Sequence, residues 1–149
     1  MRDYSEIISV TQTHSQAEKL LEEIEELEAA GFGQPGQLER TLTEKVRQGV
    51  AEAMRKGVGE TAGWSEYLGG LKNQVKEWET VELGLAFEPS ETGLERIVEE
   101  LRAAIGVPVV VRVRVDPTVV GGAVITYKGI YRDLSVKRLL NDLTQQLWS

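Results

Sequence analysis

The chain has 149 residues, no cysteine, a single histidine and a formal net charge of −7. A chain of this length can bury a core without cross-links, as one domain or as two small ones. The absence of cysteine excludes disulfide frameworks, thiolate zinc sites and a cysteine nucleophile, and His14 alone cannot build a multi-histidine metal site. The acidic charge argues against nucleic acids and anionic membranes as primary partners.

The first residues, MRDYSEIISVTQTH, lack the continuous apolar core of a signal peptide. No run approaches the roughly 20 apolar residues that a membrane-spanning helix needs. We therefore expect a cytoplasmic protein that does not insert directly into a membrane.

Three segments of the first half repeat apolar residues at helical spacing: 15–31, 35–57 and 64–78. Each is predicted to be one amphipathic helix, and glycines at 31 and 57 suit the ends of the first two. Gly69-Gly70 allows a kink in the third. Residues before 15 are too few to assign. The apolar stripes are Ala17, Leu20, Leu21, Ile24 and Leu27; Leu38, Leu42, Val46, Val50 and Met54; and Trp64, Leu68, Leu71, Val75 and Trp78.

The glutamates of the first helix begin at Glu18 and include the pairs Glu22-Glu23 and Glu25-Glu26. We expect them to form a solvated polar face, with an acidic docking surface as the alternative. Residues 1–79 carry 15 acidic and 9 basic side chains, whereas residues 80–149 carry 9 and 8. The acidic charge is therefore concentrated in the first half.

Near residue 80 the apolar period changes from 3.6 to 2, which indicates strands. Segment 81–87 is predicted to be a strand that buries Val81, Leu83, Leu85 and Phe87. Ser90 is placed to cap a helix that ends at Gly106. In the next strand, Val109, Val111, Val113 and Val115 are expected on one face, and Arg112 and Arg114 on the other.

A hairpin is predicted from residue 122 onward, with its turn at Lys128-Gly129. Asp133 and Ser135 then introduce a last helix. The predicted fold class is α+β: a short-helix bundle in residues 1–79, followed by a small β-α-β-β-β-α domain in residues 80–149.

Catalytic motifs are absent from the sequence. GFGQPG, from Gly31 to Gly36, matches the spacing of a dinucleotide-binding loop, but it follows a helix and contains Pro35. A helix end and the start of the next helix explain it. The chain contains no P-loop and no G-x-S-x-G elbow, and the paired glutamates, including Glu99-Glu100, lie on polar faces without the desolvated pocket that acid–base chemistry needs. We expect no enzymatic activity and no cofactor.

The segment VRVRVDPTVVGGAVITYKGIYRDLSVKRLLNDL resembles the C-terminal part of the delta subunit of F-type ATP synthases, whose mitochondrial relative is the oligomycin-sensitivity-conferring protein. That family shows Val-Asp-Pro after a strand, then Gly-Gly, a hairpin, and Asp-x-Ser before the last helix. The matching residues here are Asp116, Pro117, Gly121, Gly122, Asp133 and Ser135. The likeness covers about residues 80–147. Leu134 stands where the family usually has Gly, and the first half is shorter than the family's six-helix domain.

The resemblance implies a non-catalytic stator subunit that joins the catalytic head to the peripheral stalk. Its partners would be the C-terminal helices of the ATP synthase b subunit and the N-termini of the alpha subunit, in a complex bound peripherally to the inner or plasma membrane. Buried aromatic residues often anchor such contacts. Candidate anchors are Trp64, Trp78 and Trp148, with a plain core role as the alternative for each.

The residues themselves are also compatible with other functions. One is a stalk subunit of a V/A-type ATPase, although the glycines at 31, 33, 36 and 57 interrupt the long helix that such a subunit would need. Another is an unrelated α/β adaptor domain that binds a partner helix or a small ligand. A carboxylate-only hydrolase or transferase is the remaining alternative.

The Gly121-Gly122 pair allows either a β-bulge or the close approach of another backbone. We expect a neighbouring helix, the last one, to pack there. The variant Gly122→Val would then weaken folding or stalk binding.

Overall fold

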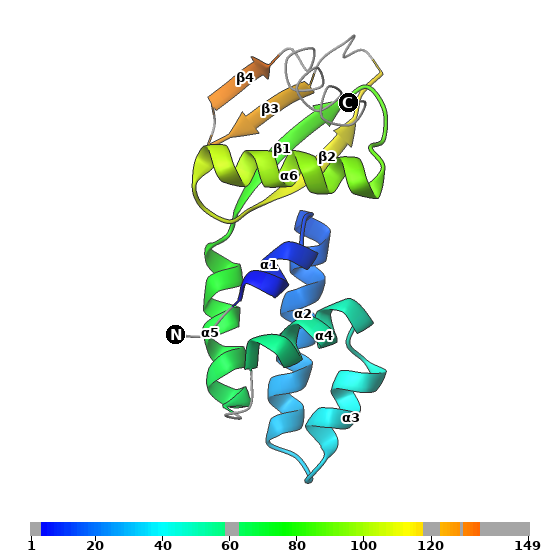
Figure 1. Ribbon diagram of the computed structural model, residues 1–149, viewed down its shortest axis with the longest axis vertical. Helices are drawn as coiled ribbons and strands as arrows, with labels where there is room; N and C mark the ends of the chain where they lie inside the picture. The colour runs from blue at the N-terminus through cyan, green and yellow to red at the C-terminus, as the bar shows by residue number, and fades with distance from the viewer. Residues whose placement is uncertain (1–3, 59–62, 118–122, 129, 135–149) are drawn as a thin grey trace. The chain divides into compact units, whose positions relative to one another are not determined.

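The computed structural model describes residues 4–58, 63–117, 123–128 and 130–134. The chain forms two compact units. The helical unit consists of Met1–Thr11 and Ser15–Trp78, and the sheet unit consists of Gln12–His14 and Glu79–Ser149. Figure 1 shows the course of the chain through both units.

Five helices make up the described part of the helical unit: α1 (Ser5–Val10), α2 (His14–Gly31), α3 (Gln37–Glu44), α4 (Gln48–Val58) and α5 (Trp64–Glu77). α1 is the segment that was too short to assign from the sequence. It packs against α4 and buries Ile7 completely. The helices predicted over 15–31 and 64–78 are confirmed as α2 and α5.

The core of the helical unit follows the predicted apolar stripes. Leu21, Leu38, Trp64 and Trp78 are only partly buried. Tyr67, which was not predicted, is fully buried because it falls one turn before Leu71 on the same side of α5. The buried members are Ala17, Leu20, Ile24, Leu27, Leu42, Val46, Val50, Met54, Leu68, Leu71 and Val75.

The prediction of one helix over residues 35–57 is wrong, because α3 ends at Glu44 and α4 begins at Gln48. Arg47 lies between them, and its backbone N–H donates to the Glu23 side chain instead of continuing a helix. Its carbonyl accepts the first hydrogen bond of α4, from Ala51 N at 2.9 Å. A side chain on α2 therefore fixes the break.

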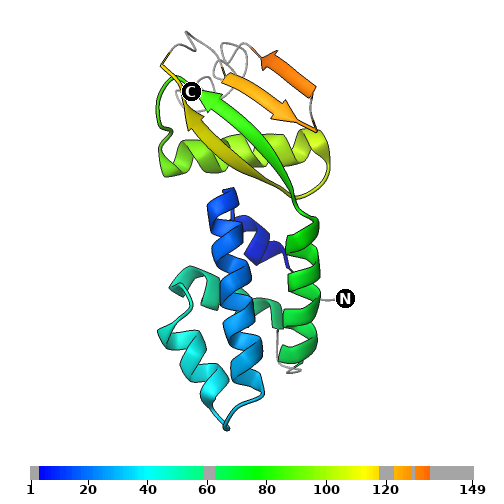
Figure 2. The same ribbon diagram turned by 180° about the vertical axis from the view of Figure 1, so that it is seen from behind.

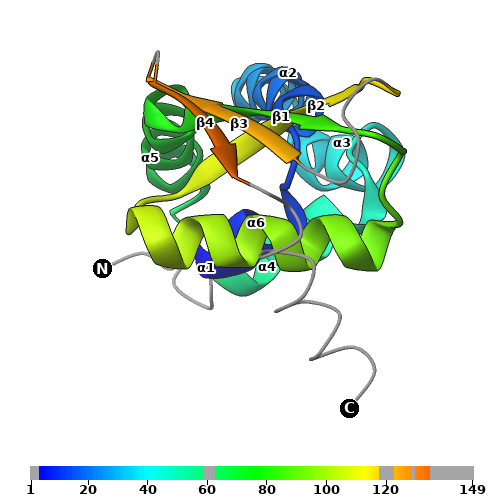
Figure 3. The same ribbon diagram turned by 90° about the horizontal axis from the view of Figure 1, so that it is seen from above.

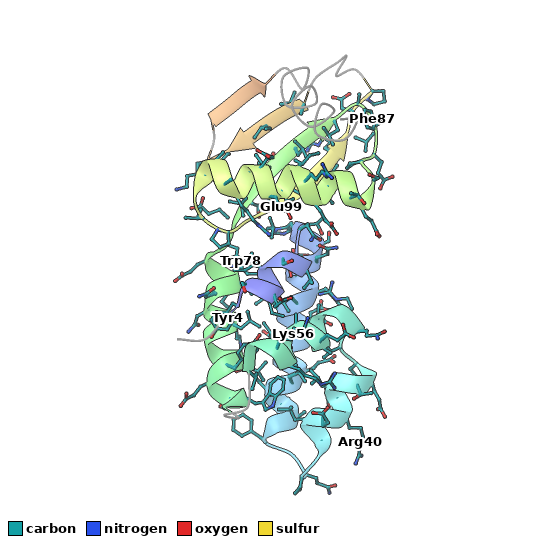
Figure 4. The ribbon with its side chains drawn as sticks, viewed as in Figure 1. Tyr4, Arg40, Lys56, Trp78, Phe87 and Glu99 are labelled. Carbon is teal, nitrogen blue, oxygen red and sulfur yellow. The ribbon has the colours of Figure 1, made fainter. Side chains whose placement is uncertain are left out.

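α5 runs as one helix through Gly69-Gly70. A Cβ atom at Gly70 would collide with the hydroxyl of Tyr4, whereas one at Gly69 would meet nothing within 4 Å. Figure 4 shows Tyr4 just before α1, directed toward α5. The Tyr4 and Tyr67 rings lie 5.2 Å apart between centroids. Gly70 therefore makes room for the Tyr4 ring.

The sheet unit contains β1 (Glu79–Leu85), α6 (Glu91–Ile105), β2 (Val109–Val115), β3 (Ala123–Tyr127) and β4 (Ile130–Leu134). The strand order is β2-β1-β3-β4. β1 and β2 are parallel, joined through α6, and β3 is antiparallel to both β1 and β4. α6 lies along one face of this sheet (Figure 3), and Figure 2 shows the sheet from the other side.

Both ends of α6 are capped as predicted. The Ser90 hydroxyl accepts a hydrogen bond from Gly93 N at 3.0 Å, and Gly106 closes the helix with a left-handed backbone at φ 85°. Arg102 near the end of α6 donates from Nε to the Val109 carbonyl at 3.0 Å, which ties the helix to the start of β2. Between α6 and the sheet lies a core of Val81, Leu83, Leu85, Ile97, Val98, Leu101, Val109, Val111, Ala123 and Ile125.

The predicted burial of Phe87 is wrong, and Val115 is exposed although it lies on the predicted face. Phe87 lies beyond the end of β1 and is 59% exposed, and Val115 at the end of β2 is 48% exposed. Alternation predicts the face toward which a residue points but not whether that position is covered, since Leu85, the partner of Val115 in β1, is 6% exposed. Val110 is 2% exposed although it points away from the core face, so both faces of β2 are buried near its start.

The α+β class is confirmed, with helices preceding a mixed sheet. Lys128 carries a left-handed backbone at φ 51° in the predicted turn, and β3 pairs with β4 from Tyr127↔Ile130. β4 extends through Asp133 to Leu134, so Asp133 belongs to a strand and not to the start of a helix. The predicted last helix lies outside the described residues.

Candidate functional site

Asp116 and Pro117 stand at the end of β2. The Asp116 N–H donates to the Leu85 carbonyl at 2.7 Å, which extends the pairing with β1 by one residue beyond Val115. Pro117 has no N–H and cannot continue a ladder. It is exposed. The dipeptide therefore ends the strand, as its chemistry predicts.

Asp133, the other described motif residue, lies near the same end of the sheet. Leu85 pairs with Ala123 of β3, and Ala123 pairs in turn with Leu134 of β4. Asp133 is the neighbour of Leu134 and stands opposite Val124. Asp116 and Ala123 thus both bind or pair with Leu85, whereas the end of β4 pairs with Ala123. Gly121, Gly122 and Ser135 lie outside the described residues.

The tryptophans proposed as anchors are half-buried where the structure describes them. Trp64 opens α5 and meets the Tyr67 ring edge-on, with centroids 6.0 Å apart. Trp78 caps the other end of α5, where its backbone N–H donates to the Val75 carbonyl at 3.2 Å. Its Nε1 is buried and has no hydrogen-bond partner among the described residues. Figure 4 shows Trp78 at the end of α5. Trp148 lies outside the described residues.

Sequence reasoning missed a buried charge in the helical unit. Glu23 was expected on a solvated face, but it is 1% exposed and its carboxylate binds the Arg47 guanidinium. The expectation is wrong because the burial depends on Arg47, which lies 24 residues later in the chain. The spacing of Glu23 from Leu20 and Leu27, both on the buried stripe, was the available signal. Glu22, Glu25 and Glu26 are exposed as expected.

A polar cluster at the turn of the β3–β4 hairpin was also missed. The Glu79 carboxylate at the start of β1 accepts a hydrogen bond from the Tyr127 hydroxyl and lies 3.1 Å from Lys128 Nζ. The Tyr127 hydrogen bond, then the Lys128 contact, lowers the pKa of Glu79. The same partnership with Glu79 raises the pKa of both Tyr127 and Lys128. The cluster fastens the turn to β1.

Residues 12–14 leave the helical unit and join the sheet unit. Thr13 forms a parallel bridge with Val111 at the outer edge of β2, where the Val111 N–H donates to the Gln12 carbonyl at 2.9 Å. His14 Nδ1 lies 3.1 Å from Thr80 Oγ1. The lone histidine is thus partly buried in a structural contact.

The described residues contain no group of three or more His, Asp or Glu side chains placed to hold a metal ion. No helix in the described part of the chain is both long and apolar enough to cross a membrane. Motif residues, tryptophans and strand edges offer backbone groups, rings and charges. Such groups can form hydrogen bonds, ring contacts and ion pairs with another molecule.

Much of the chain is similar to known proteins. The model of the ATP synthase delta (OSCP) subunit family matches residues 53–147. The ATP synthase subunit delta of Heliobacterium modesticaldum is 34% identical over 77 residues, which cover 52% of this chain and 42% of that protein. The match thus spans less than half the length of that relative. The family match begins inside α4 and includes α5 and almost all of the sheet unit.

Proposed function

This chain belongs to the ATP synthase delta (OSCP) subunit family, and from that premise we propose that it is a non-catalytic stator subunit of an F-type ATP synthase. In this role it links the catalytic head to the peripheral stalk formed by the b subunit and holds the head against rotor torque. The coupling ion of the machine is a proton or sodium. The chain is then a peripheral member of a membrane-bound complex, on its cytoplasmic side.

The observation that carries the proposal is the family match over residues 53–147. That stretch contains β1, α6, β2, β3 and β4, together with all six motif residues, from Asp116 to Ser135. Asp116 and Pro117 end β2, and the Asp116 N–H binds the Leu85 carbonyl of β1, so this part of the motif acts on the fold of the sheet unit. A fold-determining motif suits a subunit whose function is to hold two partners in place.

A stator subunit contacts both the stalk and the head, and each contact is assigned to one unit of the chain. Stalk binding is assigned to the sheet unit, because the family match covers it almost entirely. Head binding is assigned to the helical unit, where the match covers only α5 and the end of α4. The partners are the C-terminal helices of the b subunit and the N-termini of the alpha subunit.

The test of membership in the complex is affinity purification. A tagged chain is expressed in its source organism, and membranes are extracted with a mild detergent. We expect the alpha and b subunits to co-purify with it. Recovery of neither subunit, under conditions where the tagged chain itself is folded, would contradict the proposal.

The two contacts can be separated with purified components. Isothermal titration calorimetry would measure binding of the full chain to a soluble fragment that holds the C-terminal helices of b, and to a synthetic peptide with the N-terminal sequence of alpha. Binding of b without alpha would limit the stator role to the stalk contact, and binding of alpha without b would limit it to the head contact.

The tryptophan anchors are tested in the same assay. Trp64→Phe and Trp78→Phe keep an aromatic ring in each half-buried position but remove ring area and the indole N–H. An interface role predicts weaker binding with an unchanged unfolding midpoint. A core role predicts a lower midpoint with unchanged binding. Phe32→Ala is the control, because Phe32 is 90% exposed between α2 and α3.

A further inference from the structure

The outer edge of β2 presents a row of backbone groups. β2 is an end strand in the order β2-β1-β3-β4 (Figure 1). Asp116 N points toward β1, where it binds the Leu85 carbonyl. Because the N–H direction alternates along a strand, the N–H groups of Val111, Val113 and Val115 point outward.

This edge already accepts an extended segment of the chain. The Val111 N–H donates to the Gln12 carbonyl at 2.9 Å, and Thr13 forms a parallel bridge with Val111. The pairing stops there because α2 begins at His14. Farther along the edge, the N–H groups of Val113 and Val115 have no backbone partner among the described residues.

The side chains along the open part of the edge differ between the two faces. Val113 packs partly against the sheet core, and Val115 is 48% exposed on the same face. Arg112 and Arg114 are exposed on the opposite face. Arg112 lies 3.4 Å from the Glu82 carboxylate, whereas Arg114 has no ion pair within the described part of the chain.

We propose that the β2 edge from Val113 to Val115 binds an extended segment of another protein in which apolar residues alternate with carboxylates. The segment would add a strand beyond Val111, and its backbone would pair with the outward groups of Val113 and Val115. Its apolar side chains would lie beside Val115, and its carboxylates beside Arg114. Unpaired strand edges bind extended chains readily, and the flanking charge selects among them. This edge is independent of the stalk contact, which involves helices.

The probe is a capped eight-residue peptide of alternating valine and glutamate. The full-length chain, labelled with ¹⁵N, is titrated with it and followed by nuclear magnetic resonance and amide hydrogen exchange. We expect exchange to slow at the Val113 and Val115 amides. The Arg112 and Arg114 amides face β1 and serve as internal references, with no change in exchange.

The control peptides separate the contribution of charge from nonspecific hydrophobic binding. An alternating valine–lysine peptide keeps the strand pattern but reverses the charge, and we expect it to bind more weakly. A peptide with four valines followed by four glutamates keeps the composition without the alternation, and we expect no protection at Val113 or Val115. Equal binding of all three peptides would overturn the proposal.

The variant Arg114→Glu reverses the charge beside the edge at an exposed position. We expect it to weaken binding of the valine–glutamate peptide about fivefold, in line with an exposed charge pair, and to favour the valine–lysine peptide. Arg40→Glu in α3 makes the same change of net charge elsewhere and should leave binding unchanged. Figure 4 shows Arg40 on the outer side of its helix. Val115→Pro removes one outward N–H and should also weaken binding.

Two results would overturn the proposal outright. One is slow exchange of the Val113 and Val115 amides in the free, dilute chain, which would show that the protein covers its own edge. The other is protection that rises with protein concentration and without peptide, which would make a second copy of the chain the occupant. If Val115→Pro does not fold, Arg114→Glu and the control peptides still test whether the β2 edge binds the valine–glutamate peptide.

Discussion

Glu23 of α2 accepts three hydrogen bonds from Arg47, the residue just before α4: from the backbone N–H at 2.7 Å, from Nε at 2.9 Å and from Nη2 at 2.6 Å. The Glu23 side chain is 1% exposed and the Arg47 side chain 36%. Arg47 Nη2 also donates to the Gln16 carbonyl at 3.3 Å. A buried carboxylate with this many donors both fastens α4 to α2 and interrupts the helical period between residues 44 and 48.

Removing the guanidinium should destabilise the helical unit strongly. Arg47→Met leaves Glu23 buried with only one backbone donor, and we expect a loss of about 2–3 kcal/mol, less than for a fully buried pair because Arg47 is partly exposed. Glu23→Gln keeps the shape and should cost about 1–2 kcal/mol. Urea denaturation measures both free energies of unfolding.

The control is an ion pair of the same type on the surface. Arg55 Nη2 lies 2.8 Å from Glu39 Oε1, but both side chains are largely exposed, at 42% and 63%. Arg55→Met should therefore change the free energy of unfolding by no more than about 0.5 kcal/mol. Equal losses for Arg47→Met and Arg55→Met would refute the structural role of the buried pair.

The adjacent glycines of α5 should respond differently to the same substitution. Gly69→Ala adds a methyl group in open space and should stabilise the helix by up to about 1 kcal/mol. Gly70→Ala adds it against the Tyr4 hydroxyl, so we expect it to gain much less or to destabilise the chain. Thermal unfolding compares the two variants directly.

A second substitution tests whether the Tyr4 hydroxyl causes the difference between Gly69→Ala and Gly70→Ala. Tyr4→Phe removes the hydroxyl but keeps the ring beside Tyr67. In the Tyr4→Phe background, Gly70→Ala should gain about as much stability as Gly69→Ala does. A double-mutant cycle without coupling between positions 4 and 70 would show that Tyr4 does not explain Gly70.

The cap of α6 provides a local stability prediction. The Ser90 hydroxyl accepts from Gly93 N at 3.0 Å, so Ser90→Ala should cost about 1 kcal/mol. Thr92→Ala, at an exposed position in the first turn, should change stability by less than about 0.5 kcal/mol. Chemical denaturation followed by circular dichroism measures both, and a Ser90→Ala effect as small as that of Thr92→Ala would contradict the capping role.

Local patterns in the sequence predicted the elements that depend on nearby residues. The stripe of α2, the Ser90 cap and the strand end at Asp116-Pro117 follow from spacing and backbone chemistry within a few residues. The position of Glu23 could not be predicted in this way, because its partner comes 24 residues later. The pairing of Thr13 with Val111 joins residues that are 98 positions apart, so no periodic pattern indicates it.

Burial at strand ends was predictable only in part. Alternation assigned Val115 and Phe87 to the same side as the buried residues of their segments, but Val115 lies on the edge strand β2 and Phe87 lies beyond the end of β1, and both are exposed. Exposure here depends on which strand lies at the edge of the sheet and on where a strand ends, and an alternating pattern contains neither. Among the candidate site residues, Asp116 and Pro117 could be predicted to end a strand, whereas the Glu79–Tyr127–Lys128 cluster depends on the register of β1 against β3.

The Glu79 cluster should make stability depend on pH at both extremes. The hydrogen bond from Tyr127 and the charge of Lys128 lower the pKa of Glu79 below its ordinary 4.5 in the folded state. A lowered carboxyl pKa contributes stability above the unfolded value, and that contribution is lost as the pH falls through the folded value. The pKa of Tyr127 is raised above 10.0 by Glu79, so its contribution is present below that pH and is lost as the pH rises.

Glu79→Gln removes both contributions. The free energy of unfolding of the parent chain should exceed that of the variant at neutral pH, and the difference should shrink as the pH falls below about 4.5. Urea denaturation at a series of pH values measures it. The Tyr127 pKa, followed by nuclear magnetic resonance, should fall toward 10.0 in the variant. Glu88→Gln, an exposed carboxylate near the end of β1, is the control. A stability difference for Glu79→Gln that stays constant into acid would mean that the ionised form of Glu79 is not what fastens the hairpin turn to β1.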